Sequence, residues 1–131
     1  MKERDLISLV IPCYNEQESH PYLYSELQKI TEELREFEFE FLFINDGSYD
    51  CTSDILLKYA KSDPRVRYFG FSRNFGKEAA MFAGFCNARG KYVAVMDADM
   101  QDPPSLLPGM LEILIGQGYN SVAARRVDRT G

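Results

Sequence analysis

Residues 6–16 of the chain read LISLVIPCYNE. Residues 6–11 are apolar and rich in β-branched side chains, and the run stops at Pro12, as a buried strand of a parallel sheet would. Residues 16–35 are mostly polar but carry apolar side chains at helical spacing, namely Leu23, Leu27, Ile30 and Leu34. A buried strand followed by an amphipathic helix predicts the first unit of an α/β fold.

The same alternation continues along the rest of the sequence. Further strands are expected at residues 39–44, 66–71, 92–96 and 121–124. Helices are expected from an N-cap at Thr52 or Ser53 up to Pro64, over residues 76–88, and from Pro103 through Leu114. This order predicts a mostly parallel sheet with helices on both faces.

Composition excludes several classes of protein. With 131 residues the chain fits one domain, and its net charge of -5 argues against nucleic acid as the main partner, because phosphate backbones attract basic surfaces. The three cysteines form no C-x-x-C pair, which argues against a zinc or redox motif and favours a cytoplasmic setting. No stretch approaches the roughly eighteen apolar residues of a membrane-spanning helix. The single histidine, His20, lies among polar residues and is expected at the surface.

Polar residues follow four of the predicted strands and supply the candidate site. They are Asn15 and Glu16, Asn45 and Asp46, Arg73 and Asn74, and the run from Asp97 to Asp102. Ligands of open α/β sheets bind beyond the carboxyl ends of the strands, so these side chains are expected to meet at one rim.

The run after the fourth strand predicts a metal site. In an extended segment Asp97, Asp99 and Gln101 point to one side and present oxygen ligands suited to Mg²⁺ or Mn²⁺. A calcium loop would need glycine at its sixth position and glutamate at its twelfth, where Asp102 and Pro108 stand. The alternative is that these acids cap the next helix, and for Asp102 the two interpretations are equally good.

The other candidates also have structural interpretations. Asp46 precedes a glycine in a turn that needs such a pair on geometric grounds alone. Glu16 suits the first turn of the next helix. Arg73 is placed to meet a phosphate or carboxylate but equally suits a solvated surface, and Lys77 is typical of a solvated helix residue.

Four ordered motifs cover nearly the whole chain: residues 10–16 (VIPCYNE), 45–48 (NDGS), 72–78 (SRNFGKE) and 97–104 (DADMQDPP). On these motifs the chain resembles the family 2 glycosyltransferases of the GT-A fold, whose core is a Rossmann-like parallel sheet. Within that family it is most similar to the bacterial polyprenyl-phosphate sugar transferases, which are related to dolichol-phosphate mannose synthase. The last two motifs together favour this branch.

The resemblance implies roles for individual residues. Pro12, Tyr14 and Glu16 would lie along the nucleotide, and Asp46 would bond the pyrimidine ring. Arg73 and Lys77 would stand near the nucleotide or its phosphates. Asp97 would lie near the ribose and sugar, while Asp99 and Gln101, with Asp97 close by, would hold the metal that bridges the diphosphate. Asp97 and Asp99 would therefore be the catalytic pair.

The implied reaction is a metal-dependent, inverting transfer from a UDP- or GDP-sugar to a polyprenyl phosphate or another acceptor. A phosphate acceptor is already anionic and needs no general base, and no obvious base stands in the chain. Residues 1–131 are expected to be the nucleotide-sugar-binding part of a GT-A domain cut at its C-terminal side. Contact with the cytoplasmic face of a membrane would come from regions beyond Gly131, and homo-oligomerisation is left open.

The sequence departs from the family pattern in one motif. Asn45 replaces the first of two aspartates, and residues 49–51 (YDC) replace small side chains. The sequence also argues against two other functions. A sugar nucleotidyltransferase would show a glycine-rich loop where residues 12–16 stand without glycine, and a phosphoacceptor receiver would need a lysine near Arg125. A nucleotide-sugar-binding module without turnover stays an alternative.

Overall fold

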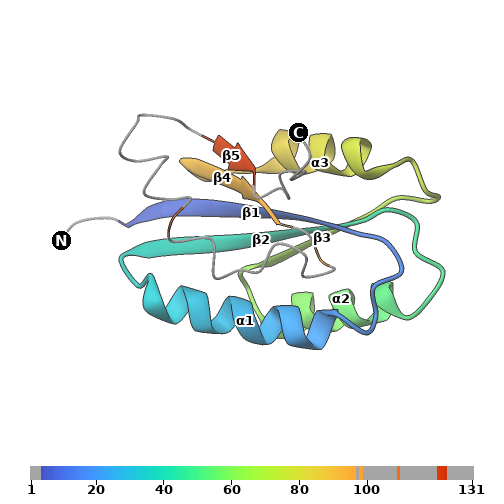
Figure 1. Cartoon of the computed structure of the whole chain (residues 1–131), viewed down its shortest axis with the longest axis horizontal. Coiled ribbons are helices and arrows are strands. Elements are labelled where there is room, and N and C mark those ends of the chain that lie inside the picture. The colour runs from blue at the N-terminus through green and yellow to red at the C-terminus, as the bar shows by residue number, and fades with distance from the viewer. Residues whose placement is uncertain (1–3, 97, 99–108, 110–120, 124–131) are drawn as a thin grey trace, which may run out of the picture.

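A computed structural model describes residues 4–96, 98, 109 and 121–123 of the chain (Figure 1). In chain order its elements are β1 (Asp5–Cys13), α1 (His20–Glu33), β2 (Phe37–Asn45), α2 (Thr52–Ser62), β3 (Val66–Gly70), α3 (Lys77–Asn87), β4 (Tyr92–Val95) and β5 (Ser121–Ala123). Each predicted strand is present. Asp97, Asp99 and Gln101 lie outside the described residues, as does the helix expected from Pro103 apart from Gly109, which is helical.

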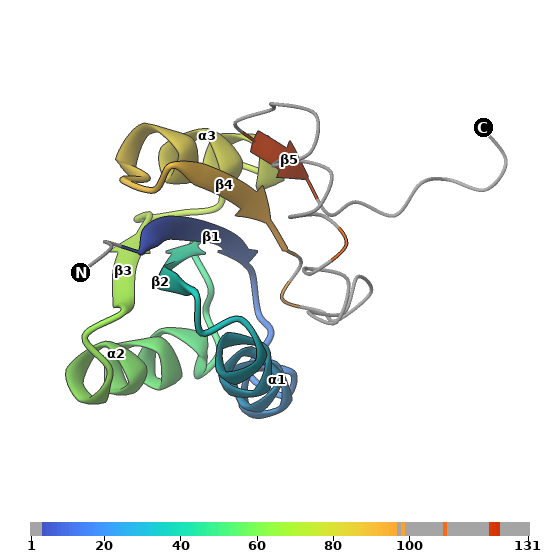
Figure 2. The same cartoon turned by 90° about the vertical axis from the view of Figure 1, so that its left-hand side faces the viewer.

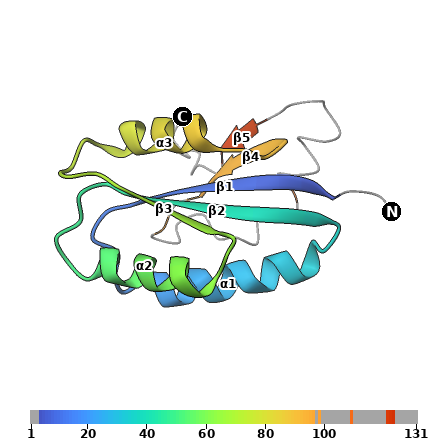
Figure 3. The same ribbon diagram turned by 180° about the vertical axis from the view of Figure 1, so that it is seen from behind.

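The strands form one parallel sheet in the order β3-β2-β1-β4-β5. Helices α1 and α2 cover one face and α3 covers the other, which Figures 2 and 3 show from two further directions. The predicted α/β architecture is therefore confirmed. The strand order reverses between β1 and β4, and in such sheets the crevice beyond that switch point is where ligands bind.

The core lies in two layers, one on each face of the central strands. Alternate residues of β1 point to opposite faces, so Leu9 joins the larger cluster under α1 and α2 while Val10 joins the smaller one under α3. Gly84 lets α3 approach β1 closely, because a Cβ at that position would lie 2.2 Å from Val10 Cγ1.

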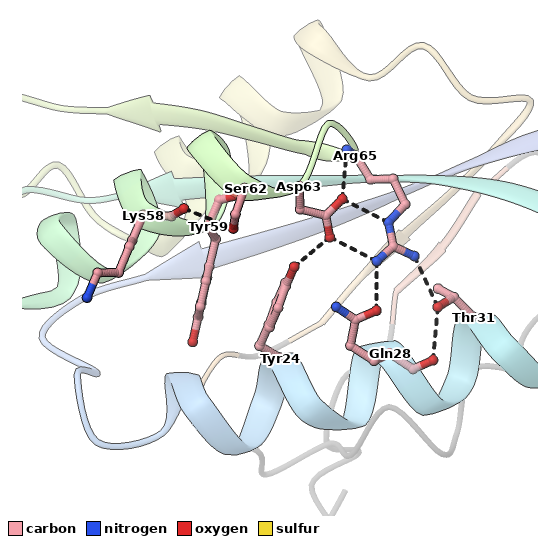
Figure 4. Close-up of polar contacts among 8 residues, drawn as sticks. All are labelled: Tyr24, Gln28, Thr31, Lys58, Tyr59, Ser62, Asp63 and Arg65. Atoms are coloured by element: carbon pink, nitrogen blue, oxygen red, sulfur yellow. Dashed lines mark hydrogen bonds and ion pairs between the residues drawn. The ribbon is translucent and has the colours of Figure 1, made fainter.

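The connection from α2 to β3 is tied to α1 by a polar cluster (Figure 4). Arg65 donates through Nε and one NH2 group to the carboxylate of Asp63, and also to Gln28 Oε1 and Thr31 Oγ1 on α1. Tyr24 donates its hydroxyl to the same carboxylate. Burial alone would raise the pKa of Asp63, but the hydrogen bonds from Arg65 and Tyr24 outweigh it and lower the pKa to about 2.

Two expectations about helix starts are wrong. Thr52 is the first residue of α2 rather than its cap, and Cys51 holds the N-cap position. The Asp50 carboxylate accepts the Thr52 N–H at 2.8 Å, which leaves the Thr52 hydroxyl to accept the N–H of Glu16. The first helix begins at His20 rather than near Glu16, because residues 14–19 form bends and turns.

Among the helices that the structure describes, none combines the length and apolar character needed to cross a membrane.

Candidate functional site

A cavity of about 370 Å³ opens at the carboxyl edge of the sheet, where β1, β2 and the start of α3 meet. It is lined by Pro12, Cys13, Tyr14, Glu16, Asp46, Asn74, Gly76, Lys77 and Ala98. These residues come from three of the four predicted strand ends and from the position between Asp97 and Asp99. The convergence expected from the sequence therefore exists in the structure.

Asp46 links the loop after β2 to the loop before α3. It is 3% exposed, and its carboxylate accepts the N–H groups of Phe75 at 2.7 Å and Gly76 at 2.9 Å. The side-chain amide of Asn74 donates to the same carboxylate at 2.9 Å. A carboxylate has about four lone-pair positions, two on each oxygen. Gly76 and Asn74 donate to Oδ2 and Phe75 donates to Oδ1, so one position on Oδ1 remains. Asp46 can therefore organise the cavity wall and still accept one hydrogen bond from a ligand.

Gly47 allows these two loops to touch. Its φ of +72° lies in the left-handed region, and a Cβ there would lie 2.3 Å from the carbonyl carbon of Arg73. A side chain at this position would force the loops apart. The Asp-Gly pair predicted as a turn therefore also serves as a contact surface.

Residues 15–17 and 48–52 are joined by hydrogen bonds in both directions. In one direction the N–H groups of Asn15, Glu16 and Gln17 donate to Ser48 Oγ, Thr52 Oγ1 and Asp50 Oδ2 at 2.9, 2.9 and 3.3 Å. In the other, the N–H groups of Tyr49 and Cys51 donate to Asn15 Oδ1 and Gln17 Oε1 at 2.9 and 2.8 Å. Asn15 has a φ of 50°, a left-handed conformation that asparagine tolerates. These hydrogen bonds hold the loop that carries Tyr14 and Glu16 in place.

The structure brings most of the predicted binding residues together. Pro12, Tyr14, Glu16, Asp46 and Lys77 all line the cavity. Arg73 is exposed and does not line it; its guanidinium lies 4.6 Å from the centre of the Phe75 ring.

Four lining residues were not predicted as binding residues, namely Cys13, Asn74, Gly76 and Ala98. Gly76 and Ala98 lie inside the motifs 72–78 and 97–104, next to residues that were predicted. Asn74 stands beside Arg73 at a strand end, which was a usable signal. Cys13 gave none, because it is an uncharged residue beyond the predicted strand 6–11, which in the structure extends to Cys13. Its thiol donates to the Ile11 carbonyl, and burial raises its pKa, so it is a neutral part of the wall.

His20 is not at the surface, and that expectation is wrong. The side chain is fully buried at the start of α1, and its ring centroid lies 5.9 Å from that of Phe43. Neither ring nitrogen has a hydrogen-bond partner within the described part of the chain. Burial lowers the pKa of His20 from 6.5 to about 4, against the opposing effect of the Asp50 carboxylate.

The wild-type protein is expected to lose stability through His20 as the pH falls from 6.5 to 4, and replacing His20 with leucine is expected to remove this loss. In this window the unfolded chain binds a proton that the folded chain excludes, so the free energy of unfolding falls as pH falls. The loss reaches about 3 kcal/mol near the lower end. Urea denaturation of both proteins across this range measures the difference between their free energies of unfolding. The carboxylates titrate in both proteins, so their contributions cancel in this difference. If the difference in free energy of unfolding does not change with pH, His20 is not a neutral imidazole buried in the folded protein.

No group of three acidic, histidine or cysteine side chains that could hold a metal ion occurs among the described residues. Asp97, Asp99 and Gln101 are not described, so the metal site stays a prediction. Ala98 is buried and lines the cavity, which brings the middle of the predicted metal motif to its wall.

A second hollow, of about 520 Å³, lies at the opposite edge of the sheet. It contains several arginines, of which Arg65 and Arg67 are bonded to Asp63 and Glu40. It lies at the amino ends of the strands, away from the crevice where α/β sheets bind ligands.

Comparison with known proteins identifies relatives of the chain. The family described as glycosyl transferase family 2 matches residues 8–131. A prophage bactoprenol glucosyl transferase homolog of Escherichia coli (strain K12) is 44% identical over 124 residues, which make up 95% of this chain and 40% of that protein. The bactoprenol glucosyl transferase of Shigella phage SfV matches with the same identity and coverage. The chain thus spans about two fifths of the length of these curated relatives.

Solved structures share the fold. A mannosyltransferase from Pyrobaculum calidifontis, in complex with GDP-Man and Mn²⁺, has a TM-score of 0.64 at 20% identity, covering 75% of this chain and 28% of its own. TarS 1-349 of S. aureus, in complex with UDP-GlcNAc, has a TM-score of 0.64 at 23% identity, covering 86% and 32%. These likenesses confirm the predicted GT-A fold. The match of the family model over residues 8–131 shows that the chain belongs to glycosyltransferase family 2.

Proposed function

We propose that the cavity binds the nucleoside diphosphate of a UDP- or GDP-sugar, and that the sugar is transferred to a polyprenyl phosphate. The observation that carries this proposal is the lining of the cavity, which combines an aromatic ring, a hydrogen-bond acceptor and a cationic side chain. Tyr14 offers a flat apolar surface for a base, Asp46 offers one acceptor position for a ring N–H, and Lys77 offers positive charge for phosphate oxygens.

The start of α3 further suits an anionic ligand. Gly76 and Lys77 line the cavity at the N-terminal end of this helix, where the helix dipole favours negative charge. Glu16 lies on the β1 side of the same cavity, where it can meet the ribose hydroxyls or the base. Arg73, outside the lining, would act at the outer end of the diphosphate.

The chemistry of the donor set indicates which residues would hold a divalent ion. Asp46 is unsuited, because its oxygens already accept three N–H groups. Asp99 and Gln101, with Asp97, are the oxygen donors nearest in sequence to Ala98 in the cavity wall. Mg²⁺ or Mn²⁺ held there would supply charge neutralisation on the departing diphosphate.

The proposed transfer inverts the anomeric carbon. An oxygen of the acceptor phosphate forms the new bond to that carbon from the opposite face, and the bond to the diphosphate oxygen breaks. The electron pair leaves with the nucleoside diphosphate, and no proton has to be removed from an ionised phosphate acceptor. The names of the relatives, bactoprenol glucosyl transferases, support a lipid-phosphate acceptor and a glucosyl group.

Calorimetric titration of the chain with UDP and GDP, each with and without Mn²⁺, tests the donor site. We expect binding that Mn²⁺ strengthens at least tenfold, and we expect Asp99→Ala to lose this metal dependence. Asp54→Ala, an exposed acid on α2, is the matched control and should behave as wild type. Absence of metal-dependent binding to both nucleotides would refute the proposal, and retained dependence in Asp99→Ala would move the metal site elsewhere.

The acceptor is tested separately with polyprenyl phosphate and labelled UDP-glucose or GDP-mannose. Label is expected in the lipid phosphate. Transfer to a sugar or protein hydroxyl instead would refute the lipid-phosphate acceptor while leaving the donor site intact.

A further inference from the structure

Tyr49 is held in place although it is almost fully exposed. At 84% exposure it is the most exposed large hydrophobic side chain in the described part of the chain. Its N–H donates to Asn15 Oδ1 at 2.9 Å, and its ring packs at 82° against that of Tyr14, with 6.2 Å between the ring centroids. Burial in the core therefore does not explain its position, whereas contact with Tyr14 does.

The Tyr14 ring is the aromatic wall of the cavity. It is 39% exposed, and the described residues provide no hydrogen bond to its hydroxyl, so its orientation depends on ring packing. A perpendicular contact covers at most one face of a ring. The Tyr49 contact can thus fix the Tyr14 ring and still leave it a face for a planar ligand.

Hydrogen bonds join the two backbone segments that carry this ring pair. Asn15, between the two tyrosines in the contact, both donates to Ser48 Oγ through its N–H and accepts the N–H of Tyr49. Tyr14 and Tyr49 are 35 residues apart in sequence, yet these two hydrogen bonds hold their segments side by side. The rings therefore meet in a defined geometry before any ligand arrives.

We propose that Tyr49 is a positioning residue for recognition of the donor's nucleobase, acting through the Tyr14 ring. The inference rests on the proposed function, since it assumes that the cavity binds a nucleotide. Holding the ring in advance spares the entropy of ordering it upon binding. Its effect should be limited to ligands that carry a base, because the diphosphate is met by other residues.

The test compares Tyr49→Ala and Tyr49→Phe with wild type, and Tyr22→Ala serves as the matched control. Tyr22 is a tyrosine on α1 that is 60% exposed and does not line the cavity. The probes are UDP, GDP and inorganic pyrophosphate, all with Mn²⁺, with affinities measured by calorimetry and pyrophosphate measured by displacement of the nucleotide. We expect Tyr49→Ala to weaken the nucleotide that wild type binds by roughly fivefold, as loss of one aromatic pair would. Pyrophosphate affinity should stay within about twofold, and Tyr49→Phe and Tyr22→Ala should match wild type.

Three results would overturn the inference. Unchanged nucleotide affinity in Tyr49→Ala would show that the ring pair plays no part in recognition. An equal loss for nucleotide and pyrophosphate would indicate general damage to the loop. If wild type binds neither UDP nor GDP, the proposed function itself is refuted. The wild-type titration alone distinguishes this outcome from a failure of the inference about Tyr49. If Tyr49→Ala does not fold, Tyr49→Leu is measured in the same way.

Discussion

Replacing Asp46 with alanine is expected to lower the free energy of unfolding by about 4 kcal/mol and to abolish nucleotide binding. The carboxylate is buried and accepts the N–H groups of Phe75 and Gly76 as well as the amide of Asn74. Alanine would leave these donors without their acceptor and would release the loop that forms one wall of the cavity. Urea denaturation measures the first effect, and calorimetry with UDP or GDP and Mn²⁺ measures the second.

Asp46→Asn separates the two roles of this side chain. One amide oxygen can accept some of the loop bonds, so we expect a smaller loss of stability, but the acceptor position toward a ring N–H is weakened. Asp54→Ala, which removes an exposed acid, should change stability by less than about 1 kcal/mol. A stable Asp46→Ala protein with normal nucleotide affinity would contradict both the loop anchor and the binding role.

Replacing Glu40 with alanine is expected to cost about 4 kcal/mol of unfolding free energy without changing nucleotide affinity in the protein that remains folded. Glu40 is 6% exposed and lies near the amino end of β2, far along the strand from Asp46. Its carboxylate accepts hydrogen bonds from Ser8 Oγ, from Arg67 Nη1 and from the N–H of Arg89. Its loss would leave the buried Ser8 hydroxyl without its acceptor and would deprive the partly buried Arg67 guanidinium of its carboxylate partner, so that among the described residues only the Asn87 carbonyl still accepts from it.

Glu38→Ala is the matched control for Glu40. Glu38 lies two residues earlier on β2 and points to the same side of the sheet, but its side chain is 56% exposed and its ion pair with Arg4 spans 3.5 Å. Such a surface pair contributes about 0.5 kcal/mol. Equal stability losses in Glu38→Ala and Glu40→Ala would contradict the buried network around Glu40. A loss of nucleotide affinity in folded Glu40→Ala would contradict the expectation that Glu40 acts on stability alone.

Much of the site could be predicted from strand ends alone. Polar residues after parallel strands share one edge, so Glu16, Asp46 and Asn74 were expected near each other, and they line one cavity. The resemblance added Pro12, Tyr14 and Lys77, which also line it. Arg73 was expected at the nucleotide but lies outside the lining. Its backbone passes close to Gly47 and its guanidinium lies over the Phe75 ring, and neither contact is between neighbours in a predicted element.

Long-range contacts explain what the sequence could not show. His20 has polar neighbours in sequence, but the α1 face that carries it is pressed against Phe43 of β2. The Thr52 hydroxyl suits a helix cap by type, yet it bonds the N–H of Glu16 from a loop 36 residues earlier. Phe43 and Glu16 are both far in sequence from the residues that they contact, so the pattern of neighbouring residues could not predict these two contacts.

By itself the sequence determined the order of strands and helices and the edge of the sheet at which the polar residues meet. Both follow from side-chain periodicity and from the geometry of parallel strands, which are local properties of the chain. Only the tertiary structure decided that Asp46 anchors the loop before α3 and that Tyr49 packs against Tyr14. Those contacts depend on how loops from different strands meet, and that is decided by packing across the sheet.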